Sequence, residues 1–249
     1  MTGPKPYCGN ELEYFARAHH WKAYFRDQIA SFVGGRVLEV GAGLGATTAA
    51  LSVLPHDAWV CLEPDAEMAA SLQTQAISRA LPPAEMRHGT LAALAAAERF
   101  ETILYMDVLE HIEEDGAELA RAAGHLALGG HLVVLSPAHS HLYSSFDRAI
   151  GHYRRYDRAS LLAVAPNGLE LVRLAYLDSV GMLASLANRW LLKKDLPSAA
   201  DIALWNGVMV PLSRWLDPLF GYRLGKSILG VWRKPPSREP QEGGNTVSP

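Results

Sequence analysis

Hydrophobic positions along the chain follow two different spacings. Across residues 11–33, apolar side chains recur every three or four positions, which is the stripe of an amphipathic helix. From there to Pro137, short aliphatic runs alternate with helical stretches. The predicted strands are RVLEV, AWVCLE, EMRH, FETILYMD and HLVVLS, and the predicted helices between them are ATTAALSVL, DAEMAASLQTQAISRA, TLAALAAA and GAELARAAGHLA. This alternation predicts a parallel sheet with helices on both faces, whose ligands bind beyond the carboxyl ends of the strands.

The pattern changes after Pro137. A loop rich in His, Ser, Tyr and Arg leads to a helix, ASLLAVA, and a strand, LELVRLAYL. Two helical stretches follow at about 179–222, and Pro211 should kink the second. Their Trp-rich stripes favour internal packing, with an acceptor pocket, a dimer surface and a shallow membrane contact as alternatives. A last strand, SILGVWRK, precedes residues 237–249, whose composition is typical of a disordered tail.

Composition and charge narrow the classes of function. Hydrophobic residues make up 49% of the 249 residues and charged residues 20%, as in an ordinary globular protein. The net charge of −3 provides no field that would gather nucleic acid. Cys8 and Cys61 lie far apart with no cluster of metal ligands beside them, so we predict neither a disulfide framework nor a metal site. We find no secretory signal or membrane span and expect a cytoplasmic protein without stable membrane insertion.

The strongest candidate for a binding site is the glycine turn in the sequence EVGAGLG. Glycines let a ligand approach the backbone, and the helix that follows begins with unpaired N–H groups. Gly41, Gly43 and Ala46 also fit a dinucleotide-binding pattern, with Glu63 near the distance of a ribose-binding acid, so a NAD(P)-dependent oxidoreductase is an alternative. Glu39 argues against a dinucleotide site, because a dinucleotide-binding strand is normally apolar at this position. A carboxylate at this point suits the ammonium and sulfonium groups of S-adenosylmethionine.

From about Tyr14 to Lys234 the sequence resembles the class I S-adenosylmethionine-dependent methyltransferases. EVGAGLG is similar to the first motif of the family, and the acid in CLEPD is similar to the acid that ends its second strand. The resemblance implies that Glu39 holds the methionine portion of the cofactor and that Glu63 accepts both ribose hydroxyls. Thr90 stands where an Asp often contacts the adenine amine. The candidate cofactor-binding residues are Tyr14, Glu39, Gly41, Ala42, Gly43, Gly45, Glu63, Pro64, Gly89, Thr90, Leu91, Asp107 and Val108.

The sequence DVLEHI at 107–112 resembles the fourth motif of ubiquinone-biosynthesis O-methyltransferases and their relatives. The family's fold is α/β, a Rossmann-like, mostly parallel sheet of seven strands with helices on both faces and the last strand antiparallel. We therefore expect a methyltransferase domain over 35–236, with a helical insertion at about 179–222. Residues 1–34 would form an N-terminal helical segment and a candidate lid.

The resemblance implies an enzyme that moves a methyl group from S-adenosylmethionine to a small-molecule acceptor and leaves S-adenosylhomocysteine. In-line displacement chiefly requires alignment, and an acceptor hydroxyl also requires a base. His111, after strand four, is the first candidate base or acceptor-orienting group, and His152 is the second. We expect an oxygen nucleophile on an acceptor that is anionic or partly hydrophobic. The candidate acceptor-binding residues are Tyr143, Tyr153, Arg154, Arg155 and Tyr156.

Each candidate also has a plainer explanation. Glu39 would otherwise be a solvated carboxylate at a strand end, His111 a packing or capping residue, and the segment 151–158 a charged helix entry with local pairs. A non-catalytic protein that binds S-adenosylmethionine is a further alternative to the enzyme. The sequence is compatible with a monomer and with a homodimer.

Overall fold

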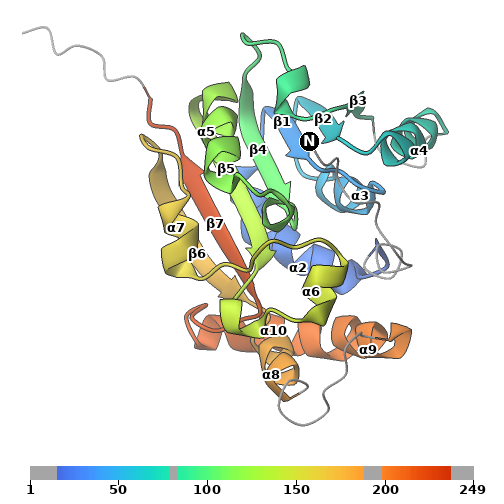
Figure 1. The fold of residues 1–249 in the computed structure, drawn as a ribbon, viewed down its shortest axis with the longest axis vertical. Coiled ribbons are helices and arrows are strands. Elements are labelled where there is room, and N and C mark those ends of the chain that lie inside the picture. Colours follow the sequence, from blue (N-terminus) through green and yellow to red (C-terminus); the bar gives the residue numbers. More distant parts are fainter. Residues whose placement is uncertain (1–15, 79–82, 188–197, 237–249) are drawn as a thin grey trace, which may run out of the picture.

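The computed structural model describes residues 16–78, 83–187 and 198–236, and its centre is one seven-stranded sheet (Figure 1). The strand order is β3-β2-β1-β4-β5-β7-β6, in which β7 runs antiparallel to both of its neighbours and the other pairs are parallel. The α/β sheet with an antiparallel last strand is therefore confirmed. The strands are β1 Arg36–Val40, β2 Ala58–Glu63, β3 Glu85–His88, β4 Phe100–Met106, β5 Leu126–Pro137, β6 Glu170–Leu177 and β7 Ser227–Arg233.

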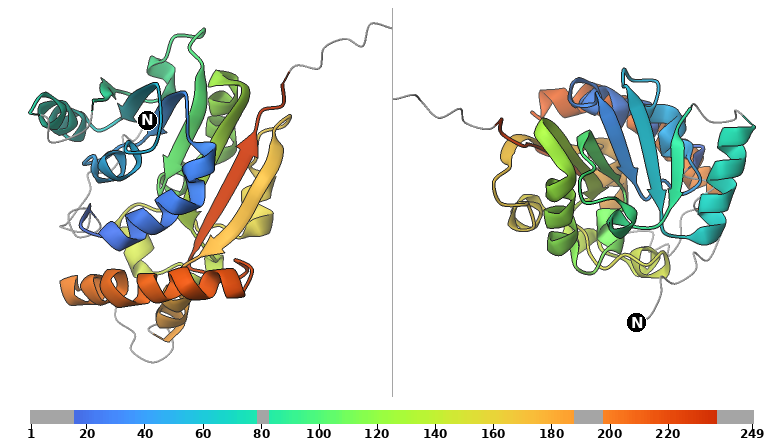
Figure 2. Two further views of the ribbon diagram at one scale, coloured as in Figure 1. Left: turned by 180° about the vertical axis from the view of Figure 1, so that it is seen from behind. Right: turned by 90° about the horizontal axis from the view of Figure 1, so that it is seen from above.

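Helices cover both faces of this sheet (Figure 2). Successive side chains of a strand point to opposite faces, so Val37 packs in one apolar cluster and Leu38 in the other. The first cluster includes residues of α2, α4 and α9, and the second includes residues of α5 and α7. The helices are α2 His19–Ile29, α3 Ala46–Leu51, α4 Ala66–Ile77, α5 Asp115–His125, α6 Ser145–Ala149, α7 Arg158–Ala163, α8 Ser179–Ala187, α9 Ala199–Leu204 and α10 Val210–Leu219.

The segment between β6 and β7 forms α8, α9 and α10, at the end of the sheet where β4 and β5 terminate (Figure 1). α9 continues through a π-helical turn, Trp205–Met209, into α10. Pro211, at which we expected a kink, lies in the first turn of α10 directly after the π segment. Proline has no backbone N–H to donate in an α-helical hydrogen bond. The turn that precedes Pro211 is the π-helical turn, which is wider than an α-helical turn.

Two buried carboxylates attach this segment to the rest of the fold. Asp217 of α10 accepts hydrogen bonds from the Tyr24 hydroxyl at 2.7 Å and from the Asp178 backbone N–H at 2.7 Å. Asp178 has a left-handed backbone, with φ of 69°, and its side chain accepts from Trp205 Nε1 at 2.6 Å and Ser213 Oγ at 2.7 Å. These bonds join α2, the end of β6 and α10, so the insertion has one fixed position on the sheet.

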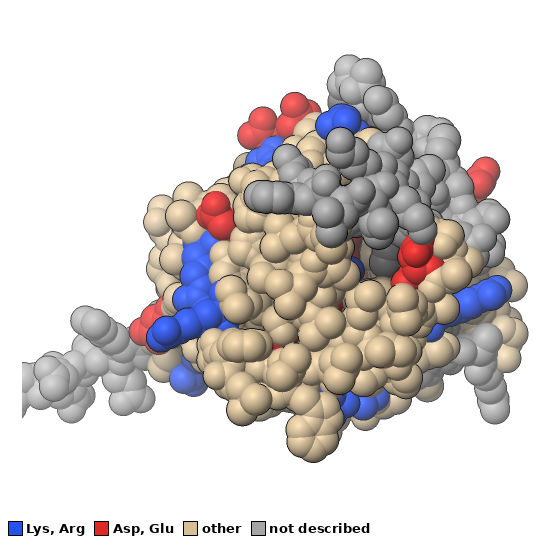
Figure 3. Space-filling view, turned by 90° about the horizontal axis from the view of Figure 1, so that it is seen from below, with Lys and Arg blue, Asp and Glu red and all other residues tan. Residues whose placement is uncertain are grey.

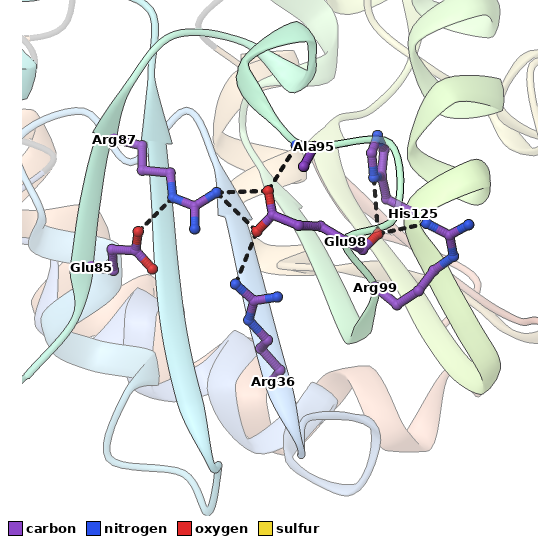
Figure 4. A network of polar contacts seen from close by, with 7 residues as sticks. All are labelled: Arg36, Glu85, Arg87, Ala95, Glu98, Arg99 and His125. Carbon is purple, nitrogen blue, oxygen red and sulfur yellow. Dashed lines mark hydrogen bonds and ion pairs between the residues drawn. The ribbon is translucent and has the colours of Figure 1, made fainter.

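The predicted helix over TLAALAAA is wrong. The chain forms only a 3-10 turn at Leu91–Ala93, and the Glu98 carboxylate accepts the Ala95 backbone N–H at 2.8 Å (Figure 4). The same carboxylate accepts from Arg87 at 2.9 Å and from Arg36 at 3.0 Å. An ion-pair network that joins β1, β3 and the segment before β4 therefore holds this connection in a conformation that helix propensity does not predict.

Some sequence predictions fall outside the described residues. Tyr14, the tail at 237–249 and the residues 188–197 within the predicted insertion belong to this group. Within the described ranges, no helix has both the length and the apolar character that crossing a bilayer requires.

Candidate active site

The glycine turn after β1 has the backbone that its sequence predicts. Gly41, Gly43 and Gly45 have φ values of 70°, 56° and 78°, in the left-handed region that favours glycine. A Cβ on Gly41 would lie 2.8 Å from Val108, so the turn packs directly on the segment that follows β4. A Cβ on Gly43 would meet no atom within 4 Å. Open space therefore borders the turn at Gly43, where a ligand has access to the backbone.

Glu63, the last residue of β2, faces this turn and is buried. Its Oε2 accepts the Gly43 N–H at 2.7 Å, and its Oε1 accepts the Asp65 N–H at 2.9 Å. Burial raises the pKa of this carboxyl, although the two backbone hydrogen bonds act in the opposite direction. A carboxylate has about four acceptor sites, so two remain for hydroxyl groups of a ligand.

Glu39 on β1 is fully buried beneath the turn. Its Oε2 accepts from Trp59 Nε1 at 2.9 Å and lies 3.8 Å from the free thiol of Cys61. Burial raises the pKa of Glu39 to about 7, against the hydrogen bonds from Trp59, Thr48 and Cys61 that favour the charged form. A nearby cation would restore the charged form at neutral pH.

Asp107 directly follows β4 and has a left-handed backbone with φ of 55°. Asp107 is exposed, although many protein atoms lie around its carboxyl group. Burial raises the pKa of Asp107 to about 6, and the charges of His152, Lys22 and Lys226 reduce the shift. Burial also lowers the pKa of Lys22 to about 8. A strained backbone and a shifted pKa are both typical of functional sites, so Asp107 is a candidate site residue.

Glu110, His111 and His152 meet beside Asp107. The rings of His111 and His152 are edge to face, with their centres 4.5 Å apart. Glu110 Oε2 accepts from Ser136 Oγ at 2.9 Å, but its buried Oε1 has no hydrogen-bond partner among the described residues and lies 3.8 Å from His152 Nε2. Burial, and next the charge of Asp107, raise the pKa of Glu110 well above its usual range. Buried polar atoms without a partner are rare in folded proteins, so this point is a candidate place for a water, an ion or a ligand atom.

Asp147 on α6 orients His152. His152 Nδ1 lies 3.0 Å from Asp147 Oδ1, and because a carboxylate only accepts, Nδ1 carries the hydrogen. Arg155 donates to both carboxylate oxygens at 2.8 and 2.9 Å, and Ser144 donates to Oδ2 through its N–H and its hydroxyl. Burial alone would raise the pKa of Asp147, but these bonds and the Arg155 charge hold it well below its usual range. His152 Nε2 is thereby directed toward Glu110.

The same three side chains offer ligand atoms for a metal ion. One atom each from Glu110, His111 and His152 lies within 4.8 Å of the others. Two imidazoles and a carboxylate suit several divalent transition metals. Our sequence prediction of no metal site therefore stays a prediction.

Comparison with known proteins agrees with this arrangement. Residues 13–174, more than half of the chain, match the model of a family described as a methyltransferase domain. The chain belongs to the class I S-adenosylmethionine-dependent methyltransferases. Its methyl donor is accordingly S-adenosylmethionine, and the two alternatives, an oxidoreductase and a non-catalytic binding protein, are set aside.

Individual relatives of this methyltransferase are distant. The ubiquinone biosynthesis O-methyltransferase of Rhodopseudomonas palustris is 26% identical over 180 residues, which is 68% of this chain and 70% of the relative. An S-adenosylmethionine-dependent methyltransferase from Clostridium acetobutylicum aligns with a TM-score of 0.57 at 10% identity, covering 91% of this chain and 95% of that one. The N-methyltransferase NodS of Bradyrhizobium japonicum aligns with a TM-score of 0.53 at 16% identity, over 91% and 99%. These structural matches show a shared fold.

The methyltransferase fold brings most of the sequence-predicted cofactor residues to one place. The glycine turn, Glu39, Glu63 and the Asp107 segment all lie at the carboxyl ends of neighbouring strands. Gly89, after β3, donates its N–H to the Glu63 carbonyl at 2.9 Å, and the Thr90 hydroxyl caps the turn that follows. Contact between these residues and the cofactor stays a prediction, as does the adenine contact of Thr90.

The predicted acceptor-binding loop is held by internal bonds. Arg154 pairs with Asp115 at 2.8 Å, and Arg155 pairs with Asp147. The buried Tyr156 hydroxyl also donates to Asp115, at 2.6 Å. Of the other two residues, Tyr143 donates its hydroxyl hydrogen to the His152 carbonyl, and Tyr153 is exposed. Acceptor binding by these five residues stays a prediction, and the structure gives both arginines an internal partner.

Sequence reasoning missed Asp147, Glu110 and Lys22 as members of the site. Asp147 had a local signal, because Ser144 and Asp147 form a capping box at the start of α6. Nothing in that motif indicates its bond to His152. Glu110 lies within the fourth motif but was not given a role, and Lys22 reads simply as a residue on the polar side of a helix.

Proposed function

We propose that this methyltransferase methylates an oxygen atom of a small-molecule acceptor, and that Glu110, His111 and His152 receive the acceptor hydroxyl. The observation that supports the proposal is the unpartnered Glu110 Oε1 in a gap lined by two imidazoles. The ubiquinone biosynthesis O-methyltransferase, whose acceptor oxygen is given by its name, is the relative that favours oxygen over nitrogen. An anionic or partly hydrophobic acceptor remains part of the proposal.

The protein residues would hold the cofactor by complementary charge. Glu63 would accept the ribose hydroxyls with its two free acceptor sites, next to the open space at Gly43. Glu39 would face the cationic methionine portion, whose charge would offset the cost of the buried carboxylate. The bound cofactor supplies an electrophilic methyl group on sulfur.

His152 would then act as the general base. Asp147 fixes its tautomer, so that Nε2 offers a lone pair toward the gap. His152 Nε2 would take the proton of the acceptor hydroxyl when the methyl group is transferred from sulfur to oxygen, and would later release it to solvent. Burial lowers the pKa of His111 to about 4, which makes its imidazole a weak base, so His111 would orient the hydroxyl rather than remove its proton.

Turnover with matched acceptors tests the proposal. Purified enzyme is given S-adenosylmethionine with phenol, carboxylic acid and amine acceptors of similar size, and release of S-adenosylhomocysteine is measured with and without EDTA. We expect the phenols to react fastest. His152→Gln should lower kcat by about 10²- to 10⁴-fold with the affinity for S-adenosylhomocysteine unchanged. Faster methylation of amines, or full activity of His152→Gln, would contradict the oxygen acceptor or the base respectively.

The cofactor contacts are tested separately by calorimetry with S-adenosylhomocysteine. Glu63→Ala should weaken binding by about a hundredfold or more, because two hydrogen bonds to a charged group are lost. Glu67→Ala, which removes an exposed carboxylate from the adjacent helix, is the control. Equal affinity of the two variants would refute the placement of the ribose at Glu63.

A further inference from the structure

The continuous helix from α9 to α10 carries an exposed apolar stripe. Leu204, Val208, Leu212, Trp215 and Leu219 recur every three or four residues, so they lie along one side of the helix. All five are exposed, and Trp215 and Leu219 each keep 80% of their surface accessible. Single exposed apolar side chains are normal on a protein surface, but a contiguous row of large ones marks a site of interaction.

This stripe is not the side of the helix that packs on the fold. The opposite side carries Trp205, Val210, Ser213 and Asp217, which are buried. Trp205 and Ser213 donate to Asp178, and Asp217 accepts from Tyr24, so the rotation of the helix is fixed by hydrogen bonds. The apolar stripe therefore faces outward in the folded protein.

Neighbouring elements extend the apolar surface. Leu183 on α8, which packs beside α10, and Phe220 and Leu224 after α10 are also exposed. Seen from below, this end of the molecule is largely free of charged side chains in its centre, with both basic and acidic side chains toward its edges (Figure 3). We call the exposed apolar side chains of α8 and of residues 204–224 the apolar face.

Several arginines lie close to the apolar face. Among the described residues of α8, α9, the π turn and α10, the acids are Asp201, which caps α9, and Asp217, which is buried. At the end of α10, Arg223 is exposed, Arg158 donates to the Tyr222 carbonyl at 3.5 Å, and Arg173 lies over the Tyr222 ring. Arg214 lies on α10 itself, paired with Asp27.

We propose that the apolar face docks the enzyme on the surface of a membrane that contains anionic lipids. An interfacial helix lies in the plane of the bilayer, with Trp and Leu in the acyl boundary and basic side chains at the headgroups. The stripe matches the first requirement, and the arginines around Tyr222 match the second. Because α8 starts where β6 ends, the docked face lies at the end of the sheet that carries the candidate active site.

Vesicle flotation tests the docking directly, without any acceptor. The full chain is mixed with phosphatidylcholine vesicles that contain or lack phosphatidylglycerol. We expect binding to the anionic vesicles and weaker binding at high salt. The double variant Trp215→Ser/Leu219→Ser should lower the partition coefficient by about a hundredfold, since each lost side chain corresponds to about tenfold.

The matched control is Val53→Ser/Ile77→Ser, which removes two exposed apolar side chains from another part of the surface. Val53 and Ile77 keep 63% and 79% of their surface accessible. This variant should bind vesicles as the wild type does, and circular dichroism checks that both variants are folded. Absence of wild-type binding, or equal binding of the two double variants, overturns the proposal. A dimer by light scattering that Trp215→Ser/Leu219→Ser dissociates also overturns it, because the apolar face is then a subunit interface.

Discussion

The buried Glu39 carboxyl makes the stability of the protein depend on pH in a direction opposite to that of an ordinary ion-paired acid. We consider Glu39→Gln, in which the amide oxygen still accepts from Trp59 Nε1 but no proton is gained or lost. The pKa of Glu39 is about 7 in the folded protein and 4.5 as its ordinary value. Between these values the folded state binds a proton that the unfolded chain has released.

Raising the pH therefore destabilises the wild type through this group. The stabilisation from the protonated folded form is complete below the ordinary value and is lost as the pH rises through about 7. The difference in bound protons between the folded and unfolded states, integrated from pH 5 to pH 8, gives a loss of about 2.5 kcal/mol. Each pH unit over which the two states differ by one whole proton contributes about 1.4 kcal/mol. Glu39→Gln lacks this contribution, so its free energy of unfolding should gain about 2.5 kcal/mol relative to the wild type across that interval.

Urea unfolding followed by circular dichroism at pH 5 and pH 8 measures this difference. The other titrating groups are shared by both proteins, so their contributions cancel in the comparison. Glu67→Gln, at an exposed position on α4, should show no such change. A stability difference between Glu39→Gln and the wild type that is the same at both pH values would refute the argument from burial.

Two further substitutions test the framework of the site. Gly41→Ala should lower both stability and affinity for S-adenosylhomocysteine, because a Cβ would lie 2.8 Å from Val108 at a φ of 70°; Gly116→Ala, where a Cβ meets nothing within 4 Å, is the control, and equal thermal unfolding of the two would contradict the clash. Asp217→Asn should cost about 2–4 kcal/mol in urea unfolding, because one amide N–H₂ would face donors such as the Tyr24 hydroxyl; a loss below about 0.5 kcal/mol would show that the network does not fix the insertion.

All seven strands could be predicted from the sequence, most of them because buried strands of a mostly parallel sheet appear as continuous aliphatic runs. The exception is β3, whose sequence EMRH is neither aliphatic nor buried and whose place follows from the alternation of strands and helices. TLAALAAA shows the limit of the same approach. Its alanines favour a helix, but the Glu98 carboxylate, paired with Arg36 and Arg87, ends the segment after one turn. A local pattern does not reveal ion pairs made with distant strands.

In the candidate site, too, residues with a local sequence signal could be predicted and contacts made by the tertiary fold could not. The glycine turn and Glu63 could be found because backbone freedom and a strand-end acid leave local signals in the sequence. The bond between Asp147 and His152 leaves none, since it depends on the path of the loop after β5. The bond between Tyr24 and Asp217 joins residues 193 positions apart, and no spacing indicates it.

The strand order has a consequence for how the sheet assembles during synthesis of the chain. β6 pairs only with β7, and β7 is the last strand among the described residues, although it lies between β5 and β6. During synthesis, β6 is made before its partner and has no neighbour to join until residues 227–233 have left the ribosome. The edge of β5 that β7 will join stays open for the same period, so the newly made chain passes through a stage at which unpaired edges of both β5 and β6 are exposed to association with other molecules.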